Sequence, residues 1–432
     1  MSPIGRVLSA AREAEPAAGW VAAAGLLAEE REAVERMLAE DPDLRVYGFN
    51  TLLGQLDNVA AVTSNQHTLL QAHLIGRTVP ITGVLPDLIL SVKLEQLSHG
   101  GSGLHPQTYR AVLQTFRGPD AEVLGAWSDS YSSGDVVPAA WWVKHLQQAD
   151  PELRLHSGDL IALLNGNFIS TAFALRACER LLGYLSRFLG KAIEVVQPGR
   201  VGALADDGDW LARVIADDLP VDSHLLRAGA NLQAPVSMRD MASYVSPIST
   251  AVDSLRAAVE SRLGAFSGNP TFARVGGRMR HASQASFLDL NLSMALTSGI
   301  QLTHFCMAAV QRFIQHVCDT RRGRAPLQYL KFVQPPKVAS ALLVEAAAKH
   351  GALPSRFQLA ESEGIEDQAD LSLSIAQSLA DLVQLAGDQL AILDDVFAMM
   401  GRTTPDAGPA YGHAMLARFA GPEHAAAHPL AG

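Results

Sequence analysis

The chain has 432 residues, a formal net charge of −10 and 48% hydrophobic residues. A chain this apolar, with only 18% charged residues, is not intrinsically disordered, and its acidic balance lacks the basic footprint of a nucleic-acid-binding protein. Aromatic residues make up only 6%, so the apolar share is mostly aliphatic residues and alanine, which favour helices.

The N-terminal segment and the cysteines predict a cytoplasmic protein. Glu13 and Glu15 interrupt the first residues before any long apolar run, so no secretory signal peptide is expected. The sequence has no uninterrupted apolar stretch of about 18 residues, so no membrane helix is expected. We expect the three cysteines to be reduced and buried, because they form no CxxC pair and have no histidines at zinc spacing: Cys178, Cys306 and Cys318.

In chain order, strand signals are weak and helical spacing dominates. The best strand candidates are the short segments 44–49 and 193–196. A helix is expected to begin after Pro247, with Ser249 or Thr250 as its N-cap, because apolar residues follow at helical spacing.

Two longer helices are predicted further along the chain. Apolar residues recur at helical spacing between residues 288 and 318, where Gly299 marks either a close helix contact or a kink. Residues 379–397 place apolar side chains on one helical face and acidic side chains mostly off it. The residues after Gly401 are rich in Pro, Ala, Gly and His, which predicts a loose extension.

The expected fold class is therefore mainly α, a long central helix bundle with a smaller, loop-rich N-terminal domain. We expect the N-terminal domain at residues 1–158, the central bundle at 159–401 and a loose C-terminal tail at 402–432.

The glycine-rich run at residues 98–103 has two functional interpretations. It could cradle a phosphate or supply an HGG-type oxyanion hole. No GxxxxGK[ST] motif, dinucleotide-spaced third glycine or GxSxG elbow supports either interpretation. A plain loop that leads into a helix at Pro106 is favoured.

The segment Ser130–Pro138 also has two interpretations. Ser-Gly-Asp alone is typical of a turn. The alternative is a backbone cyclisation, in which the Gly134 nitrogen attacks the Ser132 carbonyl and the loss of two waters leaves a methylidene on the former Ser133. Glycine is required at the third position because a Cβ would obstruct the attack. The product, 4-methylideneimidazole-5-one (MIO), is an electrophile that no ordinary side chain provides.

Seven motifs in a constant order support the cyclisation. On these motifs the chain resembles the histidine and phenylalanine ammonia-lyase family, as a divergent and short member with an ammonia-lyase/fumarase-like fold. Each motif alone is weak, but their order is kept over most of the chain. The matching segments are 46–54 (the Tyr-Gly-x-Asn-Thr-x-x-Gly loop), 68–76, 132–135, 163–172, 233–239, 267–281 and 366–367.

The resemblance implies a set of catalytic residues. Ser132, Ser133 and Gly134 would form the MIO group autocatalytically, and no metal or nucleotide is expected. Tyr47 lies where the family places its general base on a mobile loop, although it could instead be a packed turn tyrosine. Asn165 would donate hydrogen bonds around the electrophile, although it could equally cap a helix end.

The resemblance also implies a substrate-binding set. Arg239 would hold the substrate carboxylate in a bidentate fork, and Gln233 would donate hydrogen bonds around the electrophile and substrate. His73 and Glu366 match the histidine-type members at the positions that select the substrate side chain, which suits a polar or cationic substrate. Arg280 stands where the family has a phenylalanine that packs on the electrophile, and it would bring charge to the pocket.

The departures from the family leave the reaction open. Val236 replaces a tyrosine close to the electrophile. Three hypotheses follow: an MIO-dependent ammonia-lyase that acts on an α-amino acid with a histidine-like or otherwise non-standard side chain, an MIO-dependent 2,3-aminomutase that makes a β-amino acid, and a lyase-fold tailoring enzyme or non-lyase homologue of specialised metabolism. The family also implies a homotetramer whose sites are built from several chains, and no nucleic-acid or membrane partner is expected.

Overall fold

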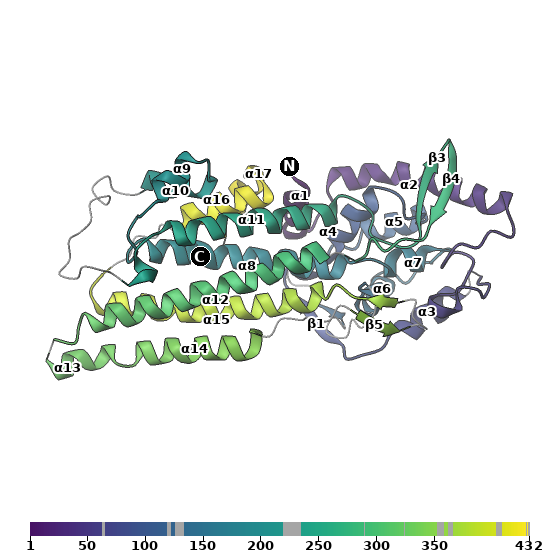
Figure 1. Ribbon diagram of the computed structural model, residues 1–432. Helices are drawn as coiled ribbons and strands as arrows, with labels where there is room; N and C mark the ends of the chain where they lie inside the picture. The colour runs from purple at the N-terminus through teal and green to yellow at the C-terminus, as the bar shows by residue number, and fades with distance from the viewer. Residues whose placement is uncertain are drawn as a thin grey trace. The chain divides into compact units, whose positions relative to one another are not determined.

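The computed structural model describes residues 1–62, 65–118, 122–125, 134–218, 235–288, 290–323, 325–351, 358–361, 366–402, 408–428 and 430. Most of these residues are helical, and the strands are short (Figure 1). The longer helices are α1 (Pro3–Glu13), α2 (Ala18–Glu40), α4 (Leu85–Ser98), α6 (Val136–Ala149), α8 (Phe168–Ala192), α11 (Ala242–Leu263), α12 (Leu290–Asp319), α14 (Pro335–His350), α15 (Ser372–Met399) and α16 (Gly408–Ala420).

The remaining elements are shorter. The helices are α3 (Asn65–His73), α5 (Pro106–Leu113), α7 (Asp159–Leu164), α9 (Val201–Asp206), α10 (Trp210–Asp218), α13 (Pro326–Tyr329) and α17 (Pro422–Ala427), with 3₁₀ turns η1 (Gly54–Leu56), η4 (Val236–Met238) and η5 (Leu330–Phe332). The strands pair antiparallel, β1 (Val79–Thr82) with β2 (Glu122–Gly125), β3 (Thr271–Val275) with β4 (Arg278–Ala282) and β5 (Gln358–Glu361) with β6 (Glu366–Gln368).

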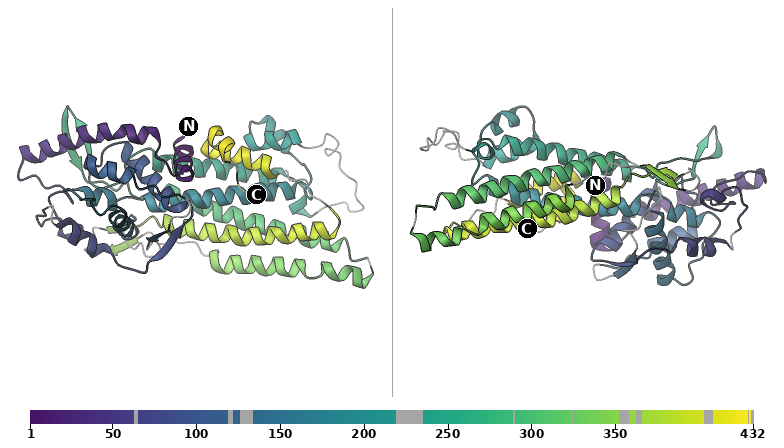
Figure 2. Two further views of the ribbon diagram at one scale, coloured as in Figure 1. Left: turned by 180° about the vertical axis from the view of Figure 1, so that it is seen from behind. Right: turned by 60° about the horizontal axis from the view of Figure 1, so that its bottom comes forward.

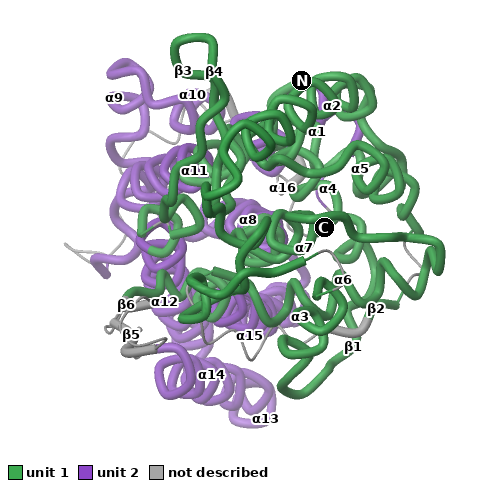
Figure 3. Tube along the Cα trace, turned by 90° about the vertical axis from the view of Figure 1, so that its right-hand side faces the viewer, with its two compact units in different colours: residues 1–175, 258–293, 354–376 green, residues 176–257, 294–353, 377–432 purple. Residues whose placement is uncertain are grey.

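The chain forms two compact units, each built from several stretches of sequence (Figure 3). Unit 1 comprises Met1–Leu175, Ala258–Ser293 and Pro354–Ala376, and unit 2 comprises Arg176–Ala257, Met294–Leu353 and Gln377–Gly432. The mainly α fold class predicted from the sequence is confirmed. The predicted division at residues 158 and 401 stays a prediction.

Unit 2 is a bundle of long helices that lie side by side (Figures 1 and 2). Phe188 of α8 meets Tyr244 of α11 edge to face, with ring centroids 5.3 Å apart, and stacks on Phe313 of α12 at 6.3 Å. A Cβ added at Gly299 of α12 would lie 3.3 Å from Leu181 of α8, so this glycine marks a close helix contact, as one of the two sequence interpretations held.

Three local predictions were wrong. Segment 44–49 forms a turn, and residues after α8 are not a strand, because the Val195 and Val196 amides donate to the Ala192 carbonyl at the helix end. Helix α11 begins at Ala242 and contains Pro247, because the Asp240 carboxylate accepts the Ala242 amide at 2.9 Å and starts the helix earlier.

The tail predicted to be loose is largely helical. Within residues 402–432, the described part forms α16 and α17, and these helices bury Tyr411 and Phe419 completely. Their apolar residues at helical spacing pack against other elements of the same unit, including α10. Alanine and histidine composition alone did not reveal this packing.

The burial of the cysteines is confirmed for Cys178, Cys306 and Cys318, and each thiol is free. Residues Asp159–Ala192 include a window long and apolar enough to cross a membrane by length and composition, and 89% of that window is buried inside the structure.

Candidate active site

The turn that carries Tyr47 is held by its own asparagine. The Asn50 side chain accepts the Val46 amide at 2.8 Å and donates to the Leu44 carbonyl at 2.7 Å. Such side-chain bonds to neighbouring backbone groups favour a turn over a strand. The half-buried Tyr47 hydroxyl accepts the Gly54 amide at 2.9 Å, so the first and last residues of the Tyr-Gly-x-Asn-Thr-x-x-Gly motif bind each other.

Gly48 presses this turn onto helix α7. Its φ of +70° lies in the left-handed region, and an added Cβ would fall 2.6 Å from the Ile161 Cβ. The turn and α7 share a small apolar cluster, which comprises Val34, Val46, Phe49, Ile161 and Phe272, with Tyr47 and Met279 packed against it. Only glycine fits at position 48 in this arrangement.

The end of α7 supplies Asn165. This residue is the C-cap of α7, and its amide donates to the Ile161 carbonyl at 2.9 Å. The Asn165 side-chain nitrogen donates to the Asn269 carbonyl at 3.2 Å, whereas its buried Oδ1 atom has no hydrogen-bond partner among the described residues. Asn165 therefore caps the end of α7, as one sequence interpretation held, and its role as a hydrogen-bond donor around the electrophile stays a prediction.

Gly134 and Asp135 lie against Gly166, the residue after Asn165. The Asp135 amide donates to the Gly166 carbonyl at 2.8 Å. Gly134 has φ +82°, and an added Cβ would lie 2.9 Å from that same carbonyl and 3.5 Å from Phe287. The third position of the predicted tripeptide therefore requires glycine both for its conformation and for space. Ser132 and Ser133 lie outside the described residues.

Buried ionisable groups surround this contact. The Asp135 carboxylate accepts the Ser170 amide at 2.8 Å and the Ser170 hydroxyl at 3.0 Å, and burial raises the pKa of Asp135 to about 7. Burial lowers the pKa of the Lys93 ammonium to about 7 and that of the Arg262 guanidinium to about 10. Burial also raises the pKa of Asp370, whose carboxyl interacts with both Arg262 and Asp135.

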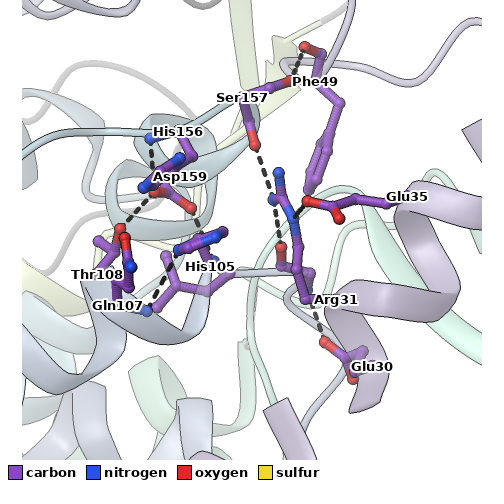
Figure 4. A network of polar contacts seen from close by, with 12 residues as sticks. Glu30, Arg31, Glu35, Phe49, His105, Gln107, Thr108, His156, Ser157 and Asp159 are labelled. Carbon is purple, nitrogen blue, oxygen red and sulfur yellow. Dashed lines mark hydrogen bonds and ion pairs between the residues drawn. The ribbon is translucent and has the colours of Figure 1, made fainter. Parts of the chain in front are cut away.

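A polar network fixes the other end of α7 (Figure 4). The fully buried Asp159 carboxylate accepts the His105 amide at 2.8 Å, the His156 amide at 2.7 Å and the Thr108 hydroxyl. Burial raises the pKa of Asp159, and these hydrogen bonds oppose the shift. Arg31 donates to the Ser157 carbonyl at 2.8 Å, next to the start of the helix. Asp159 thus anchors α7.

The glycine-rich loop binds a side chain of the chain itself. The Glu30 carboxylate accepts the Gly101 amide at 2.5 Å and the Gly103 amide at 2.7 Å (Glu30 is labelled in Figure 4). Desolvation raises the pKa of Glu30 above its ordinary value, and hydrogen bonds from the backbone amides reduce that shift. These amides would otherwise be available to a phosphate, so the plain structural interpretation of the loop is supported.

Helix α3, which carries His73, is also tied to α7. The buried Gln66 side chain accepts the Leu160 amide at 3.1 Å. His73, half-buried, lies at the C-terminal end of α3, and its Nδ1 atom is 2.7 Å from the Leu69 carbonyl. A carbonyl only accepts hydrogen bonds, so Nδ1 is the donor in this contact, and Nε2 takes no part in it.

The other predicted site residues are not brought to this cluster by the described contacts. Arg280 is exposed on β4, where it pairs with Ala273 across the hairpin. Arg239 is exposed at the end of η4 and belongs to unit 2. Only the backbone of Glu366 is described, in β6, and Gln233 lies outside the described residues.

Two residues near the site carried no role in the sequence interpretation. Lys93 is the only charged residue in the stretch Leu88–Leu94 of α4, which is apolar apart from Ser91, and such an isolated buried charge is the signal that could have identified it. Asp135 was visible in the Ser-Gly-Asp run, but its burial depends on Ser170, which only the fold brings near. Among the described residues, no group of three or more His, Cys, Asp or Glu is arranged to hold a metal ion.

Comparison with known proteins finds relatives of this chain. No family model matches the chain. It is 25% identical over 243 residues to histidine ammonia-lyase from Pseudomonas fluorescens, an alignment that covers 50% of this chain and 44% of that protein. It is 26% identical over 315 residues to histidine ammonia-lyase from an Enterobacter species, covering 61% of this chain and 60% of that protein. The chain thus spans about half the length of the curated relatives it matches.

Solved structures share the fold. Histidine ammonia-lyase from Trypanosoma cruzi has a TM-score of 0.73 at 16% identity, covering 97% of this chain and 87% of that one. Phenylalanine aminomutase from Pantoea agglomerans also has a TM-score of 0.73, at 15% identity, covering 94% and 90%. These likenesses show that the chain has the all-α fold of the histidine and aromatic amino-acid ammonia-lyases and aminomutases, and the sequence relatives named above are histidine ammonia-lyases.

Proposed function

We propose that the protein is an MIO-dependent ammonia-lyase that eliminates ammonia from an α-amino acid with a polar, histidine-like or otherwise non-standard side chain. One observation carries this proposal: a single short helix, α7, contacts two predicted catalytic segments. Ile161 packs under Gly48, beside Tyr47, and one helical turn later Asn165 leads to the Gly166 carbonyl, which lies against Gly134. The four residues from Ile161 to Asn165 correspond to a rise of about 6 Å along a helix.

The residues near Gly134 fit the proposed MIO group. Gly134 has a conformation and a contact that a Cβ would forbid, as the cyclisation chemistry demands of this position. The unpaired Oδ1 of Asn165, one residue before Gly166, is a buried acceptor, and a buried polar atom without a partner in a native site suggests a ligand or reacting group. When formed, the MIO group supplies an electrophile for the substrate amine.

Residues of this chain then provide the remaining chemistry. Tyr47 takes the proton that the elimination removes from the carbon next to the one that carries the amine. The Gly54 amide, 2.9 Å from the Tyr47 oxygen, stabilises negative charge on that oxygen. Asn165 orients the reacting groups by hydrogen bonding. His73 and Glu366 select the substrate side chain, and Arg239, Gln233 and Arg280 bind its charged ends.

The reaction is tested by intact mass and by product formation. The wild-type chain is expected to weigh two waters less than its sequence, whereas Ser133→Ala keeps full mass and Ser130→Ala, a matched change outside the tripeptide, does not. Incubation of the wild type with histidine and a panel of polar and aromatic amino acids should release ammonia and a conjugated acid that absorbs in the ultraviolet. A wild-type protein of full mass would refute the proposal.

An aminomutase is the second candidate, because phenylalanine and tyrosine aminomutases are among the fold neighbours. The same incubation separates the two reactions. A β-amino acid without a conjugated acid identifies the aminomutase, and the conjugated acid identifies the lyase. Dehydrated protein with neither product points to a tailoring reaction on another substrate.

We also propose that the protein is a cytoplasmic homotetramer. Helices of unit 2 leave large apolar side chains exposed in the single chain, and exposed apolar patches mark association surfaces. These side chains are Met294, Phe305, Leu327, Val338 and Val344. Light scattering of the purified protein tests the proposal, and a monomer would contradict it.

A further inference from the structure

Lys93 is buried in a site that does little to stabilise its charge. The side chain, from the middle of α4, has no solvent exposure. Its Nζ atom lies 4.5 Å from the centre of the Phe168 ring and 5.7 Å from that of Phe266, so aromatic faces form part of its surroundings. Within the described residues, the ammonium makes no ion pair shorter than about 4 Å, the usual limit for a salt bridge.

The cost of this burial needs a reason. Burial lowers the pKa of Lys93 to about 7, and the charge of Asp135 opposes that shift. A methionine of similar shape would fill the same apolar site without the desolvation penalty, and such replacements of buried charges are often neutral or stabilising. Stability alone therefore does not account for a lysine here.

The one hydrogen bond of Lys93 among the described residues points to a role. Nζ donates to the Asn165 carbonyl at 3.4 Å, and it would lie 3.8 Å from a Cβ added at Gly166. The next carbonyl along, that of Gly166, accepts the Asp135 amide at 2.8 Å. Two consecutive carbonyls at the end of α7 are thus held from two sides, one by Lys93 and one by the residue after Gly134.

This arrangement sets the position of the Gly134 nitrogen. The Gly166 carbonyl oxygen lies 2.9 Å from the position that a Cβ of residue 134 would take, and it accepts the peptide N–H of Asp135, which follows Gly134. Any movement of the Asn165–Gly166 peptide therefore moves Gly134. We propose that Lys93 is a positioning residue for the backbone cyclisation: by holding the Asn165–Gly166 peptide, it fixes Gly134 in the geometry from which its nitrogen attacks. This inference rests on the proposed MIO chemistry.

The cyclisation balances without any co-reactant. A bond forms between the Gly134 nitrogen and the Ser132 carbonyl carbon. The first water leaves with the Ser132 carbonyl oxygen and the protons of the Gly134 and Ser133 nitrogens. The second water takes the Ser133 hydroxyl and its α-proton, and their electron pair forms the methylidene double bond. Lys93 contributes alignment to these steps and leaves unchanged.

The experiment follows dehydration over time by intact mass during cell-free synthesis of the full chain. Lys93→Met is expected to fold, with wild-type helical circular dichroism and an equal or higher melting temperature, but to lose the two waters at least tenfold more slowly. Lys93→Arg keeps a charged donor and should restore most of the rate. Lys144→Met is the matched control and should dehydrate at the wild-type rate. Lys144 lies on α6, the helix that begins directly after Asp135.

The outcomes separate this inference from the proposed function. If the wild type keeps its full mass, the MIO proposal itself fails. If the wild type dehydrates and a folded Lys93→Met dehydrates equally fast, the MIO proposal stands and the role of Lys93 is wrong. A folded Lys93→Arg that stays at full mass also overturns the role, so the test holds even where the methionine variant does not fold.

Discussion

Gly48→Ala should destabilise the protein for two reasons, an unfavourable backbone conformation and a steric clash with Ile161. Alanine in the left-handed region costs about 1–2 kcal/mol. The new Cβ would lie 2.6 Å from the Ile161 Cβ, which is attached directly to the backbone of α7 and cannot rotate away, so overpacking adds about 1–3 kcal/mol. The total expected loss is about 2–5 kcal/mol of the free energy of unfolding.

Gly54→Ala is the matched control in the same motif. Gly54 also has a left-handed φ, +60°, but an added Cβ meets no atom within 4 Å, so only the conformational cost of about 1–2 kcal/mol applies. Urea unfolding followed by circular dichroism gives both free energies, and ammonia release shows whether the Tyr47 turn has moved. Two variants within about 0.5 kcal/mol of each other would refute the reasoning that Ile161 holds this turn in place.

Three further predictions concern the site. Tyr47→Phe should lower the turnover rate by about 10²–10⁴-fold and leave the loss of two waters intact, and full activity would exclude Tyr47 as the base. Glu30→Gln should lower the free energy of unfolding in urea by about 1–3 kcal/mol, because a neutral amide has only one oxygen to accept the two loop N–H groups. An unchanged urea midpoint would contradict a stabilising role for Glu30 in the loop. In a Ser133→Ala background, where neither chain cyclises, wild-type Lys93 should gain stability relative to Lys93→Met as pH rises from 7 towards 10, by up to about 1.4 kcal/mol per pH unit. The folded pKa is about 7 and the unfolded value 10.5, so in this window the unfolded chain holds a proton that the folded chain lacks, and a flat difference would refute the assigned pKa.

Residue pattern predicted the long helices because a wide apolar face at helical spacing needs no distant partner to be recognised. The periodicity at residues 379–397 lies within α15, and Gly299 lies at a close contact, one of the two roles that the sequence allowed. The pattern failed where a single polar contact decided the outcome. Asp240 moved the start of α11 ahead of Pro247, and two amides bound to Ala192 removed a predicted strand.

The candidate site was accessible from sequence only in part. Motif order pointed to Tyr47, Gly134 and Asn165, since each belongs to a short run with a recognisable turn or glycine requirement. Lys93 belongs to no such motif, and its proposed role rests on contacts with Asn165 and Phe168, which lie far away in the chain. Burial of a charge is a property of the folded chain, so composition and spacing gave no measure of it.

In the proposed cyclisation, the surroundings of Gly134 would make the loss of two waters a sign that unit 1 has folded. Gly134 lies against Phe287, and the neighbouring Asp135 interacts with Asp370, so both returning segments of unit 1 meet the tripeptide's end. A chain still emerging from the ribosome has not yet made these segments. Its backbone at this point is expected to remain open until synthesis has passed residue 370. The loss of two waters would therefore report, irreversibly and molecule by molecule, that the last part of unit 1 has docked.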